Sequence, residues 1–162
     1  MRSIRFARDE DLDLLAGVED DADRLFLERF RPDAWGSAPS GRVRAAEPGF
    51  LLVAVEDDLV VGFAHLLERD GAHLEQLAVR PDHGRRGHGA ALVRAALAEA
   101  ARRGHDRVTL ATYADVPWNA PFYRALGFAE MGPDPDAGDL ERWGRRIRMT
   151  AKAGVIGRNG RS

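Results

Sequence analysis

A short loop rich in glycine and arginine, close to the middle of the chain, has residue types that could bind a phosphate group. Its residues are Gly84, Arg85, Arg86, Gly87, His88 and Gly89. The loop follows an apolar run, residues 74–79, and leads into a helical pattern that begins at Ala90. The first N–H groups of a helix attract anions, glycines let a phosphate approach the backbone, and the two arginines add positive charge. The loop therefore predicts a pyrophosphate site; the alternative is an ordinary turn with solvated arginines.

Two side chains that could move a proton lie on the strand before this loop. Alternation along a strand places His73 and Glu75 on one face with Leu77 and Val79. A carboxylate there could attract an ammonium group and accept its proton, directly or through water. His73 is a second candidate base because its ordinary pKa lies closer to neutral pH. The alternative is a structural role for both residues.

A helical pattern near the N-terminus carries a carboxylate on its apolar side. Apolar residues recur at helical spacing from about Asp9 to residue 30, and Glu19 lies on the same stripe, four residues after Leu15. A carboxylate in that position is costly unless it is paired or faces a cavity. Glu19 is therefore a candidate second carboxylate for a cationic amine, the alternative being a helix-edge residue that reaches solvent. Gly17 is a candidate break in this helix.

The next stretch, residues 31–48, contains three prolines and two glycines and has no clear periodicity. We expect a loop that could cover a cleft. Trp35 is the one large apolar side chain of this loop. It is either a local packing anchor or a contact to the substrate.

Apolar runs and turn residues predict the strands. Residues 50–55 and 59–67 form a hairpin around an acidic turn, and Asp70 and Gly71 turn the chain into the strand that contains Glu75. The other expected elements are a first strand at residues 3–6, a helix at 90–103, a strand at 107–112, a short helix from 117 to 126, and strands from 128 onward and at 145–150.

Composition limits the classes of protein that fit. A chain of 162 residues with 44% hydrophobic residues predicts a single domain, residues 1–150, followed by a disordered basic tail, residues 151–162. A net charge of −2 gives no general attraction to nucleic acid or membranes. The histidines lack zinc-binding spacing and there is no cysteine, so no metal is expected. The absence of a signal sequence or a long apolar run predicts a cytoplasmic protein.

Two segments resemble the GNAT superfamily of acetyl-CoA-dependent N-acetyltransferases. Residues 77–89, LAVRPDHGRRGHG, are similar to the acyl-CoA signature Q/R-x-x-G-x-G/A of that family, and residues 119–128, NAPFYRALGF, resemble its N…FY…GF segment. The separation of the two segments also fits, and the resemblance extends over about residues 2–150. One difference is that Gly84 stands where the family usually has glutamine or arginine, with Arg85 one place later.

The resemblance implies an α/β (α+β) three-layer fold, in which about four helices flank a mixed, mostly antiparallel sheet of six to seven strands. It also implies acetyl-CoA as the acetyl donor. A backbone N–H near Leu77 to Val79, where strands splay apart, would contact the thioester. The residues expected to bind the cofactor are Leu77, Ala78, Val79, Gly84, Arg85, Arg86, Gly87, His88, Gly89, Ala90, Asn119, Pro121, Phe122 and Tyr123.

The same resemblance places Tyr123 near the thioester sulfur, where a phenol could donate a proton to the departing thiolate. Tyr123 is the expected general acid, the alternative being a packed aromatic residue, and Asn119 contacts the cofactor or caps the helix before Phe122. We expect direct attack by a primary amine of a small molecule or a peptide, with Glu75 as the base. A non-catalytic acyl-CoA-binding regulatory module is the alternative function, and a homodimer is a further expected assembly.

Overall fold

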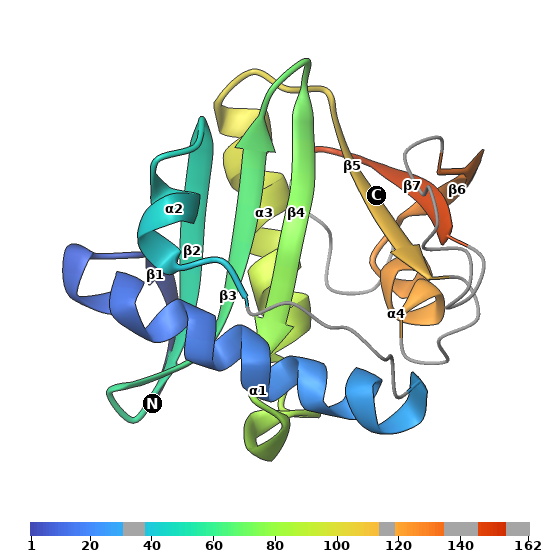
Figure 1. Ribbon diagram of the computed structural model, residues 1–162. Helices are drawn as coiled ribbons and strands as arrows, with labels where there is room; N and C mark the ends of the chain where they lie inside the picture. The colour runs from blue at the N-terminus through green and yellow to red at the C-terminus, as the bar shows by residue number, and fades with distance from the viewer. Residues whose placement is uncertain (31–37, 114–118, 135–145, 155–162) are drawn as a thin grey trace.

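The computed structural model describes residues 1–30, 38–113, 119–134 and 146–154 (Figure 1). Its strands are β1 (Arg2–Phe6), β2 (Gly49–Glu56), β3 (Leu59–Glu68), β4 (Ala72–Val79), β5 (Arg107–Tyr113), β6 (Ala129–Pro133) and β7 (Arg146–Lys152). Its helices are α1 (Leu12–Phe30), α2 (Gly41–Ala45), α3 (His88–Arg102) and α4 (Ala120–Ala125), with short 3-10 turns η1 (Asp9–Asp11) and η2 (Pro81–His83).

The strands of the described residues form one sheet in the order β1-β2-β3-β4-β5-β7-β6. Only the β4–β5 pair is parallel among these described strands, and each of the other neighbouring pairs is antiparallel. These elements confirm the predicted mixed, mostly antiparallel sheet of six to seven strands with about four helices.

Two acidic turns connect the central strands as predicted. Asp57 and Asp58, between β2 and β3, have φ of 49° and 67°, and Asp70 and Gly71, between β3 and β4, have φ of 51° and 112°. Tight hairpin turns require positive φ, which aspartate and glycine tolerate better than most residues. The local sequence therefore sets the order β2-β3-β4 in the middle of the sheet.

Helices cover both faces of this sheet, with α1 on one face and α3 on the other (Figure 1). The α3 side holds the larger core, to which the helix contributes Leu92, Val93, Ala96, Leu97 and Ala100. On the opposite face Leu15 and Val18 of α1 pack with Val53, Phe63 and Ala78. Gly17 does not break α1, which is one continuous helix.

One helix was not expected, because residues 41–45 lie in the stretch predicted to be a loop. The helix α2 begins after Ser40, whose hydroxyl oxygen accepts a hydrogen bond from the backbone N–H of Val43 at 3.2 Å. This is an N-cap, and the cap stabilises a helix too short to show periodicity. Trp35 lies outside the described residues.

The C-terminal strand continues past the expected end of the domain. β7 ends at Lys152, and the backbone N–H groups of Ala153 and Gly154 donate to the carbonyls of Asp106 and Leu97. Residues 151–154 therefore belong to the folded unit and not to a tail, while residues 155–162 lie outside the described part. Within the described residues, no helix is long and apolar enough to cross a membrane.

Candidate active site

The parallel strands β4 and β5 pair only at the start of β4. Ala72 lies opposite Val108 and His73 opposite Thr109, and beyond these residues the two strands diverge (Figure 1). A cavity of about 410 Å³ occupies this opening. The divergence that the family resemblance implied is therefore present.

Several predicted site residues line this one cavity, although they come from distant parts of the sequence. They are Glu19 of α1, Glu75, Leu77, Ala78 and Val79 of β4, and Asn119 and Tyr123 at α4. His73 does not line it but lies beside it. The structure thus brings the predicted carboxylate and the predicted phenol to the same opening.

A β-bulge at Glu75 changes which way the residues of β4 face. Leu74 pairs with Leu66 and Gln76 pairs with His65, so Glu75 has no residue opposite to it on β3. A bulge adds one residue to a strand and thereby shifts the alternation of side chains beyond it. Bulges commonly occur beside functional sites, where they redirect a side chain.

This bulge makes one sequence prediction wrong. Leu77 and Val79 pack against the α3-side core, whereas Gln76 reaches α1 on the other face through a hydrogen bond to Glu19. His73 and Glu75 do lie together, since His73 Nε2 is 3.7 Å from Glu75 Oε2. They do not share a face with Leu77 and Val79, because simple alternation does not continue through a bulge.

His73 and Glu75 differ in how exposed they are. The Glu75 side chain is 43% exposed, while the His73 ring is half-buried and shares a hydrogen bond of 2.8 Å between its Nδ1 and the Thr109 hydroxyl. Burial lowers the pKa of His73, an effect that the nearby Glu75 carboxylate only partly opposes. His73 is therefore neutral at pH 7, and Glu75 is one of three residues with carboxylate side chains that line the cavity, with Glu19 and Asp23.

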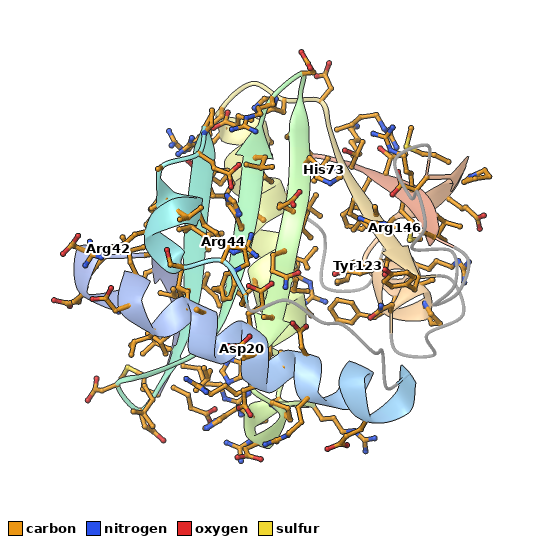
Figure 2. All side chains as sticks on the ribbon, in the orientation of Figure 1. Asp20, Arg42, Arg44, His73, Tyr123 and Arg146 are labelled. Atoms are coloured by element: carbon orange, nitrogen blue, oxygen red, sulfur yellow. The ribbon has the colours of Figure 1, made fainter. Side chains whose placement is uncertain are left out.

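Tyr123 is half-buried in an aromatic cluster at the α4 side of the cavity (Figure 2). Its ring makes edge-on contacts with Phe122 and Phe128, with ring centroids 5.1 and 5.7 Å away. Burial raises the pKa of the Tyr123 hydroxyl above its ordinary value of 10.0. The phenol therefore keeps its proton at neutral pH and can act as a hydrogen-bond donor.

Asn119 immediately precedes α4 and lines the same cavity. Its side chain makes no capping hydrogen bond, although its backbone carbonyl accepts one from the N–H of Tyr123 at 3.1 Å. The structure therefore does not support the capping role that the sequence left open. A contact from this side chain to the cofactor stays a prediction.

Glu19 is buried and paired. Both of its carboxylate oxygens accept from Arg44 Nη2, at 3.0 and 2.9 Å, and Oε1 also accepts from Gln76 Nε2 at 2.5 Å. The alternative that Glu19 is a helix-edge residue reaching solvent is thus wrong. Because Arg44 balances its charge, Glu19 offers an incoming ammonium group less attraction than Glu75 does.

Sequence reasoning missed Arg44, the partner of Glu19. It lies on α2, the helix without a periodic signal, and its Nη1 contacts Nδ1 of the buried His65 at 3.1 Å. Burial, assisted by the Arg44 charge, lowers the pKa of His65 to about 4, so its neutral ring accepts this hydrogen bond. The available signal was the cost of burying Glu19, which required a cation somewhere else in the chain.

The glycine-rich loop has the backbone geometry expected of an anion site. Arg85 and Gly87 have φ of 61° and 82°, and a side chain at Gly87 would meet no atom within 4 Å, so conformation and not space favours glycine there. The first hydrogen bond of α3 runs from the N–H of Ala91 to the carbonyl of Gly87. The N–H groups of residues 88–90 precede this ladder and are available to an anion.

The side chains of this loop make contacts that the sequence did not predict. Glu56, at the end of β2, accepts hydrogen bonds from His88 Nε2 at 2.9 Å, His83 Nδ1 at 3.0 Å and Arg86 Nη1 at 3.0 Å. These contacts, those of His88 and His83 foremost, lower the pKa of Glu56 to about 2. Arg86 and His88 therefore hold the loop in place, and binding of the cofactor by these side chains stays a prediction.

Replacing Glu56 with glutamine is expected to raise the KM for acetyl-CoA roughly tenfold, because three donors would lose a charged acceptor and the loop would lose its fixed position. The turnover number should change little, since Glu56 is remote from the cavity. Steady-state kinetics with varied acetyl-CoA measure both quantities. An unchanged KM would show that the loop keeps its shape without this carboxylate.

The same variant has a pH signature. Since folding lowers the pKa of Glu56 from its ordinary 4.5 to about 2, the charged carboxylate stabilises the protein above about pH 4.5, and this contribution disappears as the pH falls through about 2. The difference in urea midpoint between the wild type and Glu56→Gln should therefore be largest near pH 7 and shrink by pH 3. Glu28→Gln, an exposed change on α1, is the control.

Comparison with known proteins identifies the family of this chain. The model of the acetyltransferase (GNAT) family matches residues 18–128. A mycothiol acetyltransferase from Clavibacter sepedonicus is 38% identical over 90 residues, which make up 54% of this chain and 30% of that protein. The chain thus spans less than a third of that relative.

Solved structures share the fold over almost the whole chain. The ribosomal-protein-S18-alanine N-acetyltransferase from Escherichia coli has a TM-score of 0.70 and 23% identity, with 98% of each chain covered. The PaiA N-acetyltransferase from Thermoplasma acidophilum, in complex with coenzyme A, has a TM-score of 0.74 and 18% identity, with 94% of this chain and 99% of that chain covered.

The family match covers more than half of the chain and includes both segments that resembled the family, residues 77–89 and 119–128. The structural likeness extends the agreement to the sheet and its flanking helices. The chain therefore belongs to the acetyltransferase (GNAT) family, a family of acyltransferases, as its sequence predicted.

Proposed function

We propose that this protein transfers the acetyl group of acetyl-CoA to a primary amine by direct attack. The observation that carries the proposal is the opening between β4 and β5, where Glu75 and Tyr123 line the same cavity. The cavity lies between a carboxylate that can attract an ammonium group and a neutral phenol that can meet a leaving thiolate. Family membership and a relative in complex with coenzyme A support acetyl-CoA as the donor.

The residues present fit acetyl-CoA. The free N–H groups at the start of α3, together with the exposed Arg85, would hold its pyrophosphate. Past His73, β4 has no pairing with β5, so its edge offers backbone groups to the pantetheine arm and the thioester carbonyl. Phe122 lies close to the loop, since a Cβ on Gly89 would be 3.4 Å from its ring. The acetyl donor supplies the activated carbonyl.

Two residues would handle the protons of the transfer. Glu75 takes a proton from the bound ammonium group, and the amine nitrogen then attacks the carbonyl carbon as the carbon–sulfur bond breaks. Tyr123 transfers its O–H proton to the departing thiolate, which leaves as a thiol, and the phenolate then takes up the second proton that the attacking nitrogen loses as the amide forms. Backbone N–H groups near Leu77 to Val79 stabilise the charge that develops on the carbonyl oxygen.

Two classes of acceptor remain open, the amine of a small molecule and an exposed amine of a peptide. The names of similar proteins refer both to a ribosomal-protein alanine and to mycothiol. A cytoplasmic location and a homodimer also remain predictions. The non-catalytic alternative would be favoured if coenzyme A stabilised the protein against heat but no amine released thiol from acetyl-CoA.

Replacing Glu75 with glutamine is expected to lower kcat/KM for the amine by about 10²-fold, the low end for loss of a general base, because water can still carry the proton. The measurement is thiol release from acetyl-CoA with a panel of amines at several pH values. In the variant, activity should rise with pH as the unprotonated fraction of the amine increases. Wild-type activity should already be present at lower pH.

Two further variants test the assignment of the base. His73→Asn removes the second candidate while it keeps a polar side chain beside Thr109. Glu28→Gln is the charge control. A larger loss in His73→Asn than in Glu75→Gln would move the role of base to His73.

A further inference from the structure

A second cavity, of about 520 Å³, lies at the start of β4 and is rich in arginine. We call it the arginine cavity. Its charged and polar lining consists of Arg69, Arg107, Arg148, Asp70, His73 and Thr109. Three guanidinium groups thus face a single carboxylate. A cavity with this surplus of positive charge favours an anion.

The arginines of this cavity are only partly neutralised by the protein. Arg69 pairs with Glu47 at 3.4 Å, and Arg107 uses its Nε for the Thr150 hydroxyl at 2.9 Å. Arg148 lies on β7 opposite Ala111, and it makes no hydrogen bond or ion pair with any of the described residues. The positive charge of Arg148 lowers the pKa of His73, in addition to the larger effect of burial. Arg148 is therefore the group best placed to take an external anion.

His73 lies between the arginine cavity and the first cavity, which occupies the opening between β4 and β5. Its Nδ1 contacts Thr109 at 2.8 Å on the arginine side, and its Nε2 lies 3.7 Å from Glu75 on the other. Figure 2 shows His73 near the start of β4, on the same side of the molecule as Arg146 and Tyr123. A molecule whose amine lies at Glu75 needs to extend past only one imidazole ring to reach the arginines.

The phosphates of the cofactor cannot be the anion that this cavity receives. The arginine cavity includes Ala72, the first residue of β4, whereas the glycine-rich loop lies beyond Val79, the last residue of the strand. At about 3.3 Å per residue, this strand separates the two sites by roughly 23 Å. Of the two substrates, the amine acceptor is therefore the one that could bring an anion to this cavity.

We propose that the arginine cavity binds an acid group, a carboxylate or a phosphate, of the amine acceptor, with Arg148 as the main contact. This inference rests on the proposed acetyl transfer. It narrows the acceptor to an amine that carries a negative group on the same molecule. Such a substrate is recognised at both ends, by the Glu75 carboxylate at its ammonium group and by the arginines at its acid group.

The test compares acceptors that differ only in the acid group. Wild-type protein, acetyl-CoA and a thiol-release assay are used with 4-aminobutanoate against butylamine, and with 2-aminoethyl phosphate against ethylamine. We expect a kcat/KM at least about tenfold higher for the acidic member of at least one pair, through a lower KM. The pair with the larger ratio identifies carboxylate or phosphate as the preferred group. Equal values in both pairs would overturn the inference.

Arg148→Gln should remove most of this preference. Its KM for the acidic acceptor should rise about tenfold, while the KM for the neutral amine and for acetyl-CoA stay at wild-type values. Arg102→Gln, an exposed charge on α3 across the sheet, is the matched control and should keep the preference. An equal loss for acidic and neutral acceptors in Arg148→Gln would contradict a specific contact.

A binding measurement separates this inference from the proposed function. If no amine is acetylated, the proposed acetyl-transfer function is refuted, but the acid site can still be tested. Calorimetric titration of 4-aminobutanoate and 2-aminoethyl phosphate into protein saturated with coenzyme A is that test. Binding that is present in the wild type and weakened about tenfold in Arg148→Gln supports the acid site. Absence of binding, or equal binding in both proteins, refutes it.

Discussion

Replacing Tyr123 with phenylalanine is expected to lower kcat by about 10²–10⁴-fold, with little change in the KM for acetyl-CoA. The phenylalanine ring can keep the edge-on contacts to Phe122 and Phe128, so the substitution removes the hydroxyl and not the packing. A thiolate that leaves without a proton donor is a poorer leaving group, which slows the chemical step and not the binding. Thiol release at saturating acetyl-CoA and amine measures the effect.

The chain offers a matched control for this variant. It has two tyrosines, and both line the cavity. Tyr113 is on β5, where burial also raises its pKa, and its ring lies 5.9 Å from the Arg146 guanidinium. Tyr113→Phe should keep near wild-type kcat if Tyr123 is the acid. An unchanged rate in Tyr123→Phe would remove that role, and a large loss in Tyr113→Phe alone would transfer it.

The pH profile provides a second readout of the same role. Because burial raises the pKa of Tyr123, the hydroxyl remains protonated through the alkaline range in which ordinary tyrosine begins to ionise near 10.0. Wild-type kcat should therefore not fall between pH 8 and pH 10 through loss of this proton. A fall centred in that range would identify a different acid.

Local sequence was enough to predict most of the strands and helices, whereas the arrangement of the sheet was implied by the family resemblance. The hairpins around β3 could be predicted because acidic residues and glycine adopt the positive φ of tight turns. The loop before α3 could be predicted because its glycines and its place before a helix are local features. In each case the determining residues are neighbours in the chain.

The parts that could not be predicted depend on contacts between distant residues. Glu56 accepts hydrogen bonds from His83, Arg86 and His88, which lie about thirty residues further along the chain. Nothing in the sequence near Glu56 indicates these contacts. The bulge at Glu75 is likewise set by how β4 registers with β3, because one extra residue reverses every face after it. Sequence therefore identified Glu75 as a candidate base but placed it on the wrong face with Leu77.

Arg44→Ala is expected to cause the largest loss of stability, about 3–5 kcal/mol of the free energy of unfolding. Both side chains of the Arg44–Glu19 pair are buried, and the guanidinium also contacts His65. Removing it leaves the Glu19 carboxylate in a buried site with only the Gln76 amide as a described partner. An unpaired buried charge costs much more than the intact pair contributes. Urea denaturation of wild type and variant measures the difference.

The double variant Glu19→Leu/Arg44→Met separates the cost of the unpaired charge from the loss of packing. Well-packed apolar replacements of a buried ion pair are often neutral or stabilising, so this protein should be more stable than Arg44→Ala alone. Arg42→Ala is the surface control, because Arg42 also pairs with two carboxylates, Asp9 and Asp13, but is exposed. It should change stability little, since water screens exposed pairs. Equal losses of stability in Arg42→Ala and Arg44→Ala would show that burial does not increase the contribution of the Arg44–Glu19 pair to the free energy of unfolding.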